Sequence, residues 1–195
     1  MAGFLNVDCR YTPATDIVHD CVNLGVFPDG HFSVVYSHAF FEHLFIEKRL
    51  ACLKSIYRLL KNDGQIIFAG IPDFQRIASA YLGEEKGLIS ETFDLFHVYR
   101  FTHGAPEEVA GWWMAQLHKS LFDAKVVAEL LTQAGFPSYV IFRYCFREEH
   151  LPINLGFVGF KLAGKGNLPA EELCRLLQEF AGDINIKTVQ VLARK

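Results

Sequence analysis

The chain has 195 residues, of which 51% are hydrophobic and 21% charged, with a formal net charge of -3. This composition supports a folded core and excludes both intrinsic disorder and a strongly basic nucleic-acid binder. No apolar run approaches the roughly 18 residues of a membrane span, and the N-terminus has no secretory pattern. The five scattered cysteines form no C-x-x-C pair, which indicates free thiols in a reducing compartment. We therefore expect one domain over 1–195 in the cytoplasm, with neither a membrane nor a nucleic-acid partner.

Short β-branched or aromatic runs alternate with amphipathic segments along the chain. The runs predict strands at Leu5–Asp8, Asp16–His19, Phe32–Tyr36, Gln65–Ile71, Tyr139–Phe146, Phe157–Leu162 and Ile186–Ala193. Apolar residues at helical spacing, bounded by capping residues and glycines, predict helices at about 50–60, 74–82, 124–134 and 169–181. This alternation predicts an α/β fold with a mainly parallel sheet, flanking helices and an antiparallel C-terminal edge.

Residues 87–119 interrupt this alternation. The segment is rich in aromatic residues and has three histidines, His97, His103 and His118, without a clean period. We expect a lid or insertion that covers one end of the sheet and shapes a pocket for the molecule that the protein acts on. Its histidines read as surface or lid residues, with acceptor binding or proton transfer as the alternative. Trp112-Trp113-Met114 indicates core or a homodimer interface, and Ser120–Asp123 resembles a capping box for the next helix.

Polar residues follow the predicted strands where a ligand would bind an open α/β sheet, outside the carboxyl ends. They are Asp8, Asp20, Ser37 with His38, and Asp73. A carboxylate at such a place can accept hydrogen bonds from two neighbouring ribose hydroxyls or from an exocyclic amino group. The alternative is that the three aspartates only cap helices and close turns.

Several motifs, taken in their order along the chain, resemble those of a known protein family. It comprises Gly3–Asp8, Asp16–Asp20, Phe27–His38, Phe41–Leu44, Tyr57–Ile67 and Ile71–Asp73. The set resembles the class I S-adenosylmethionine (SAM)-dependent methyltransferases, in particular the methyltransferase-11-like group, and implies their Rossmann-like fold. The late helix ending at Gly135-Phe136 also resembles the family.

The resemblance implies SAM as cofactor and a small-molecule or glycan-like methyl acceptor. It assigns Asp8 to the cofactor ribose, Asp20 to adenine with Cys21 and Val22 flanking the ring, and Ser37 and His38 to the reacting groups. Glu42 and His43 match the family's "EH" pair. For a general base, histidine is the usual choice because its ordinary pKa lies near neutrality, so we expect His38 first and His43 second. We expect no metal site, since no H-E-x-x-H is present and 38 and 43 lack helical-pair spacing.

One family feature is missing from the pattern. The family's first strand and glycine-rich cofactor loop belong upstream of Gly3, and the first strand is central in the fold. Three explanations are open: a true start further upstream, a sheet that pairs its remaining strands directly, or a gap filled by a strand from another chain or the C-terminus. The alternative function is therefore a non-catalytic methyltransferase-fold module for binding or oligomerisation that has lost cofactor binding.

Overall fold

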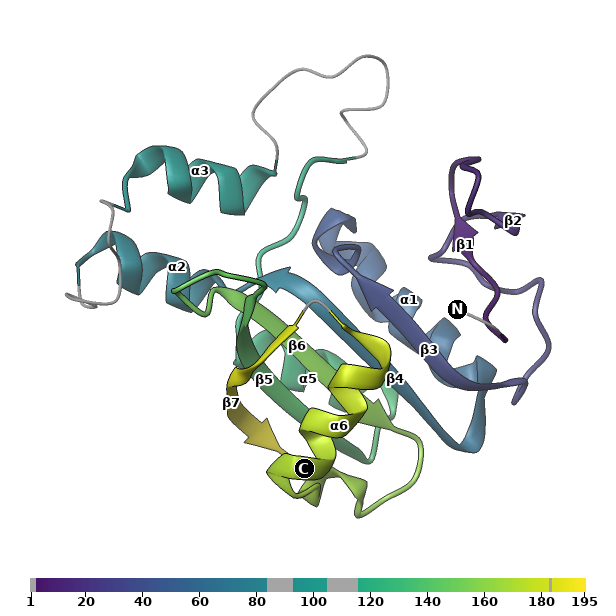
Figure 1. Cartoon of the computed structure of the whole chain (residues 1–195). Coiled ribbons are helices and arrows are strands. Elements are labelled where there is room, and N and C mark those ends of the chain that lie inside the picture. Colours follow the sequence, from purple (N-terminus) through teal and green to yellow (C-terminus); the bar gives the residue numbers. More distant parts are fainter. Residues whose placement is uncertain (1–2, 84–92, 105–115, 183) are drawn as a thin grey trace.

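The computed structural model describes residues 3–83, 93–104, 116–182 and 184–195 (Figure 1). Its strands are β1 Val7–Asp8, β2 Ile17–Val18, β3 Phe32–His38, β4 Leu60–Pro72, β5 Ser138–Phe146, β6 Asn154–Phe160 and β7 Ile184–Arg194. Its α-helices are α1 Ile46–Leu59, α2 Phe74–Tyr81, α3 Leu95–His103, α5 Ala124–Ala134 and α6 Ala170–Phe180, with 3-10 helices η1 Phe41–His43 and η2 Lys165–Asn167. Among these described helices, none is long and apolar enough to span a membrane.

The strands form two separate sheets. β1 and β2 make a small parallel pair, and the larger sheet has the order β3-β4-β6-β5-β7. The prediction of a mainly parallel sheet is wrong, because only the β3–β4 pair of the larger sheet is parallel. β6 returns from β5 through the short connection 147–153 and inserts beside β4, and short connections of this kind produce antiparallel neighbours. The α/β class and the antiparallel C-terminal edge are confirmed.

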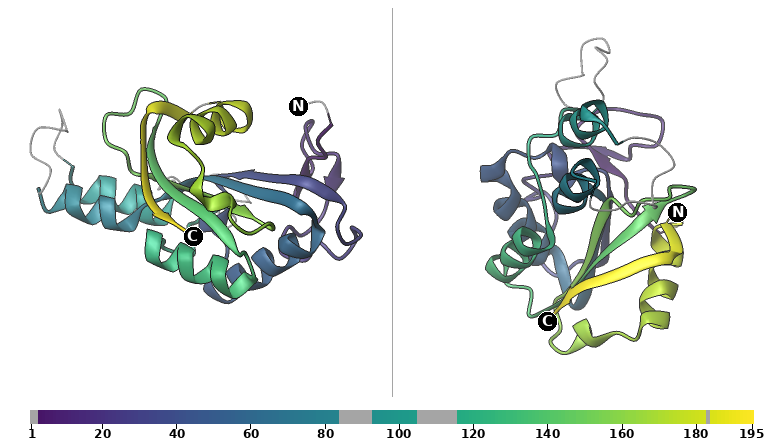
Figure 2. Two further views of the ribbon diagram at one scale, coloured as in Figure 1. Left: turned by 90° about the horizontal axis from the view of Figure 1, so that it is seen from below. Right: turned by 90° about the vertical axis from the view of Figure 1, so that its left-hand side faces the viewer.

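Helices cover both faces of the larger sheet (Figure 2). α1 and α5 pack on one face, where alternate β4 residues such as Ile66 and Phe68 join the core. α6 packs on the other face, against Ile67 and Ala69. β4 is an inner strand, between β3 and β6, and side chains on both of its faces are buried, which explains its continuous apolar run Ile66–Ala69.

Two local predictions differ from the structure. The segment 61–64, expected to end a helix, lies within β4, which begins at Leu60 because that residue pairs with Phe32 of β3. The capping box at Ser120 is wrong: Asp123 is the N-cap of α5 and accepts a hydrogen bond from Val126 N, while Ser120 Oγ donates to Leu44 O. Asp73 caps α2 as predicted.

Two buried polar contacts hold the carboxyl end of β4. Asp73 Oδ2 accepts hydrogen bonds from Nε and Nη2 of Arg143 on β5, both at 2.7 Å. Tyr144 Oη accepts from Gly70 N at 2.7 Å. Since groups buried this deeply have to be paired, these contacts fix β4 and β5 across the intervening strand β6.

Candidate functional site

A cavity of about 1080 Å³ lies between the two sheets. β1, the turn after β2 and the whole of β3 contribute to its walls. Seven of the residues that the sequence placed in a site line this cavity: Asp8, Asp20, Cys21, Val22, Ser37, His38 and His43. Two other candidates, Asp73 and Glu42, are not part of its lining. The fold thus brings together residues from four segments of the chain, although their individual roles stay predictions.

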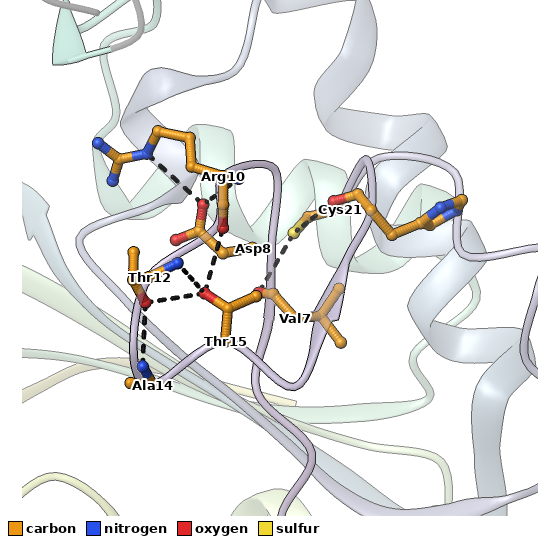
Figure 3. Close-up of polar contacts among 8 residues, drawn as sticks. Val7, Asp8, Arg10, Thr12, Ala14, Thr15 and Cys21 are labelled. Carbon is orange, nitrogen blue, oxygen red and sulfur yellow. Dashed lines mark hydrogen bonds and ion pairs between the residues drawn. The ribbon is translucent and has the colours of Figure 1, made fainter.

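Asp8 lies at the end of β1, and the following loop closes tightly behind it (Figure 3). Its Oδ1 accepts a hydrogen bond from Arg10 N at 2.8 Å and lies 3.6 Å from Arg10 Nε. Thr15 Oγ1 donates to Arg10 O and contacts Thr12 Oγ1 at 2.8 Å. Asp8 is therefore a turn residue, as the alternative interpretation proposed, but a carboxylate with about four lone-pair sites keeps the capacity to accept further bonds.

Asp20 closes a similar turn after β2, where its Oδ1 accepts from Val22 N at 2.9 Å. The neighbouring thiol of Cys21 donates to Val7 O at 3.6 Å. Burial raises the pKa of Cys21 to about 11, so the group is a neutral thiol at neutral pH and a poor nucleophile. Cys21 and Val22 thus present apolar surface beside an exposed carboxylate, which suits a flat heteroaromatic ligand.

His38 is exposed at the carboxyl end of β3, and Gly70 of β4 lies directly beside its ring. The ring packs on Phe146 at a centroid distance of 5.4 Å. Gly70 has a φ of +76°, and a Cβ there would lie 2.9 Å from His38 Cε1 and 2.9 Å from Ala39 N. Only glycine therefore fits at position 70 without displacing the imidazole.

His43 belongs to a second, more buried group at the cavity wall. Its Nε2 lies 3.7 Å from Glu42 Oε1, and its ring contacts that of His118 at a centroid distance of 5.0 Å. One ligand atom from each of Glu42, His43 and His118 lies within 4.8 Å of the others. The sequence indicated His118 as a surface or lid residue, with acceptor binding or proton transfer as the alternative. No spacing signal could link it to a pair 75 positions earlier.

The electrostatics of this group follow from its burial. Glu42 is only 2% exposed, and desolvation raises its pKa to about 8. Desolvation likewise lowers the pKa of His43 and of His118, with a further lowering by Lys119. Although Glu42 and His43 are close enough for an ion pair, burial shifts both pKa values toward the neutral forms, because it disfavours both charges.

The described strands show whether the remaining strands close the expected gap beside β3. Within the described residues, β1 pairs only with β2 and β3 only with β4. Direct pairing of the remaining strands is therefore wrong. Filling by the C-terminal strand is also wrong, since β7 pairs with β5 at the opposite edge of the larger sheet. A segment further upstream and a strand from another chain stay predictions.

Residues 6–68 match the family model described as "Methyltransferase domain". This segment is thus similar to the methyltransferase domain family, as its motifs predicted, and that family implies SAM as cofactor. No curated protein matches the chain.

Two solved structures are similar to the chain. A SAM-dependent methyltransferase from Archaeoglobus fulgidus superposes with a TM-score of 0.53 at 14% identity, over 80% of this chain and 75% of that one. A SAM-dependent methyltransferase from Thermotoga maritima gives a TM-score of 0.49 at 15% identity, over 76% of this chain. The chain spans 65% of the length of the Thermotoga protein. At these identities the first likeness establishes the fold alone.

Proposed function

We propose that the chain is a SAM-dependent methyltransferase that acts on a small-molecule or glycan-like acceptor. The observation that carries the proposal is the convergence of Asp8, Asp20, Cys21, Val22, Ser37 and His38 on one cavity beside β3. The cavity volume of about 1080 Å³ exceeds what a drug-sized ligand requires, roughly 300–1,000 Å³. The cavity thus has room for a nucleoside-containing donor and part of an acceptor.

The residues present fit the donor chemically. SAM, when bound, supplies a methyl carbon on a sulfonium; transfer breaks that S–C bond and forms a bond to an acceptor oxygen or nitrogen. Asp8 and Asp20 would accept hydrogen bonds from the donor's hydroxyl and amino groups, and Cys21 with Val22 would cover its ring. His38 would take the proton that a hydroxyl or amine acceptor loses. Most of the acceleration would come from holding donor and acceptor in line.

Binding of S-adenosylhomocysteine, the demethylated product, tests the donor site. We expect calorimetry to show binding by the chain and roughly 10- to 100-fold weaker binding by Asp8→Asn, since a hydrogen bond to a charged group contributes about 1.5–3 kcal/mol. Asp63→Asn is the matched control, because Asp63 is exposed and lies outside the cavity lining. A folded chain that fails to bind at millimolar ligand would exclude the proposal.

His38→Ala tests the proton acceptor. In an assay that follows S-adenosylhomocysteine release with hydroxyl and amine acceptors, we expect kcat to fall by about 10²- to 10⁴-fold, the usual contribution of a general base. Binding of S-adenosylhomocysteine should persist. Unchanged kcat across the pH range would remove His38 from this role and leave His43 as the candidate.

A non-catalytic binding or oligomerisation module is the second candidate function. It is favoured by one observation: within the described residues β1 pairs on one side only, with β2, and β3 on one side only, with β4. An open edge is a site where another strand can pair. A chain that self-associates but does not bind S-adenosylhomocysteine would support this candidate instead.

The remaining assignments extend the proposal. We infer a cytoplasmic protein, supported by five cysteines that are all free. The lid is supported in part by α3, which lies within 87–119. The homodimer interface at Trp112–Met114 falls outside the described residues and stays a prediction, as does the single domain over 1–195.

A further inference from the structure

We propose that Glu42, His43 and His118 bind a divalent first-row transition metal ion, with Zn²⁺ as the ion tested. Two imidazoles and one carboxylate are a donor set that zinc takes in sites with an open fourth position. The proposal is independent of methyl transfer, because it rests on this cluster alone.

The carboxylate is the first argument. Glu42 Oε2 is buried and has no hydrogen-bond partner among the described residues. A buried polar atom without a partner is rare in native structures and is destabilising by about 1–3 kcal/mol. A cation coordinated between the carboxylate and the two imidazoles would satisfy this atom.

The two imidazoles are the second argument. His43 Nδ1 lies 3.1 Å from Leu117 O, and His118 Nδ1 lies 2.9 Å from Phe101 O. Since a carbonyl can only accept, both Nδ1 atoms carry the proton, and both Nε2 atoms keep a lone pair. Metal-binding histidines in proteins are oriented in this way by backbone carbonyls or carboxylates.

The distances are the third argument. Three ligand atoms within 4.8 Å of one another share a point about 2.8 Å or less from each, against the 2.0–2.2 Å of a zinc ligand. Side-chain movements of less than about 1 Å would complete such a site. The neighbouring cation Lys119 donates through Nζ to His43 O and Leu117 O, so its ammonium group is hydrogen-bonded to backbone carbonyls.

Backbone contacts around the cluster hold His118 close to Glu42 and His43. Lys119 N and Ser120 N both donate to Glu42 O, so the chain next to His118 is fastened to η1. Gly104 ends α3 with a φ of +88°, and a Cβ there would lie 2.7 Å from Gln116 O and 3.4 Å or less from the His118 ring. Three segments of the chain thus position His118 beside Glu42 and His43. His43 also lines the cavity, so a bound ion would form part of its wall.

Metal titration of the chelator-treated chain tests the proposal. We expect one Zn²⁺ per chain by calorimetry and elemental analysis, and a rise in Tm on zinc addition. Glu42→Gln, which keeps the shape of the side chain, and His118→Ala should each weaken binding by more than about 100-fold, beyond the 10- to 100-fold typical of outer-shell changes. His150→Ala, an exposed histidine outside the cluster, is the control.

Cobalt distinguishes this site from the five free cysteines. Co²⁺ bound as proposed should give visible ligand-field bands without a thiolate charge-transfer band, and the bands should vanish in Glu42→Gln. Thiolate bands, no binding, or equal affinity in wild type and His118→Ala would each overturn the proposal.

Discussion

Asp73→Ala is expected to lower the free energy of unfolding by about 3–5 kcal/mol, the usual effect of breaking a buried ion pair. Asp73 is 0% exposed and holds the guanidinium of Arg143, itself only 12% exposed at its side chain. The substitution leaves that charge buried without its partner and also removes the N-cap of α2. Since domains are stable by only about 5–15 kcal/mol, urea denaturation followed by circular dichroism should show a much lower midpoint.

Asp123→Ala is the matched control for this result. Asp123 caps α5 through Val126 N at 2.7 Å, as Asp73 caps α2, but no ion pair of Asp123 is found among the described residues. Losing this cap should lower stability by about 1 kcal/mol. Replacing Arg143 by Met in the Asp73→Ala background should recover part of the loss, because an apolar side chain needs no partner. Equal effects of the two alanine variants would contradict the argument.

Raising the pH from 6.5 to 8 is expected to destabilise the metal-free chain through Glu42. Its pKa in the folded chain is raised to about 8 from an ordinary 4.5, so its contribution to stability is complete below pH 4.5 and is lost as the pH rises through 8. His43 and His118 act in the opposite direction: their lowered pKa values make stability fall only below their ordinary 6.5. Between pH 6.5 and 8 the change in the free energy of unfolding therefore comes from Glu42 and not from the two imidazoles.

Urea unfolding in the presence of a chelator measures this effect. One proton bound only in the folded state gives a slope of about 1.4 kcal/mol per pH unit. Glu42→Gln should flatten the slope by about that amount, whereas exposed Glu47→Gln should leave it unchanged. Any other pH-dependent group, such as Glu149, is common to all three chains and cancels in the comparison. Parallel slopes for wild type and Glu42→Gln would show that Glu42 is not the group responsible.

Local signals in the sequence were sufficient for most elements and for part of the cavity lining. Ala124–Ala134 is reproduced as a helix, and the acids after β1 and β2 lie where the strand-end rule put them. These predictions succeed because turn residues, caps and periodicity act over a few neighbours. The sheet direction was missed because β6 inserts between β4 and β5, a choice made by packing far along the chain.

The cluster of Glu42, His43 and His118 likewise depends on contacts between distant segments, which the sequence did not predict. Glu42 and His43 were noticed as a pair, but their chemistry depends on His118, which the chain brings to them through Gly104 and the backbone of Lys119 and Ser120. Neither the spacing of residues nor the composition predicts such a contact. The capping prediction at Ser120 failed for a related reason, since its hydroxyl donates to the distant Leu44 carbonyl.

The missing side chain of Gly70 has an evolutionary consequence. The space that a Cβ would take is occupied by the ring of His38 and the amide of Ala39, so the two positions, 32 residues apart, are constrained together. A lineage that replaces the imidazole by a smaller group relaxes only part of the steric demand at 70, because the Ala39 amide and the positive φ still favour glycine there. Among descendants of this chain, glycine at 70 should therefore be kept wherever histidine is kept at 38, and its replacement should be rarer before the histidine is lost than after.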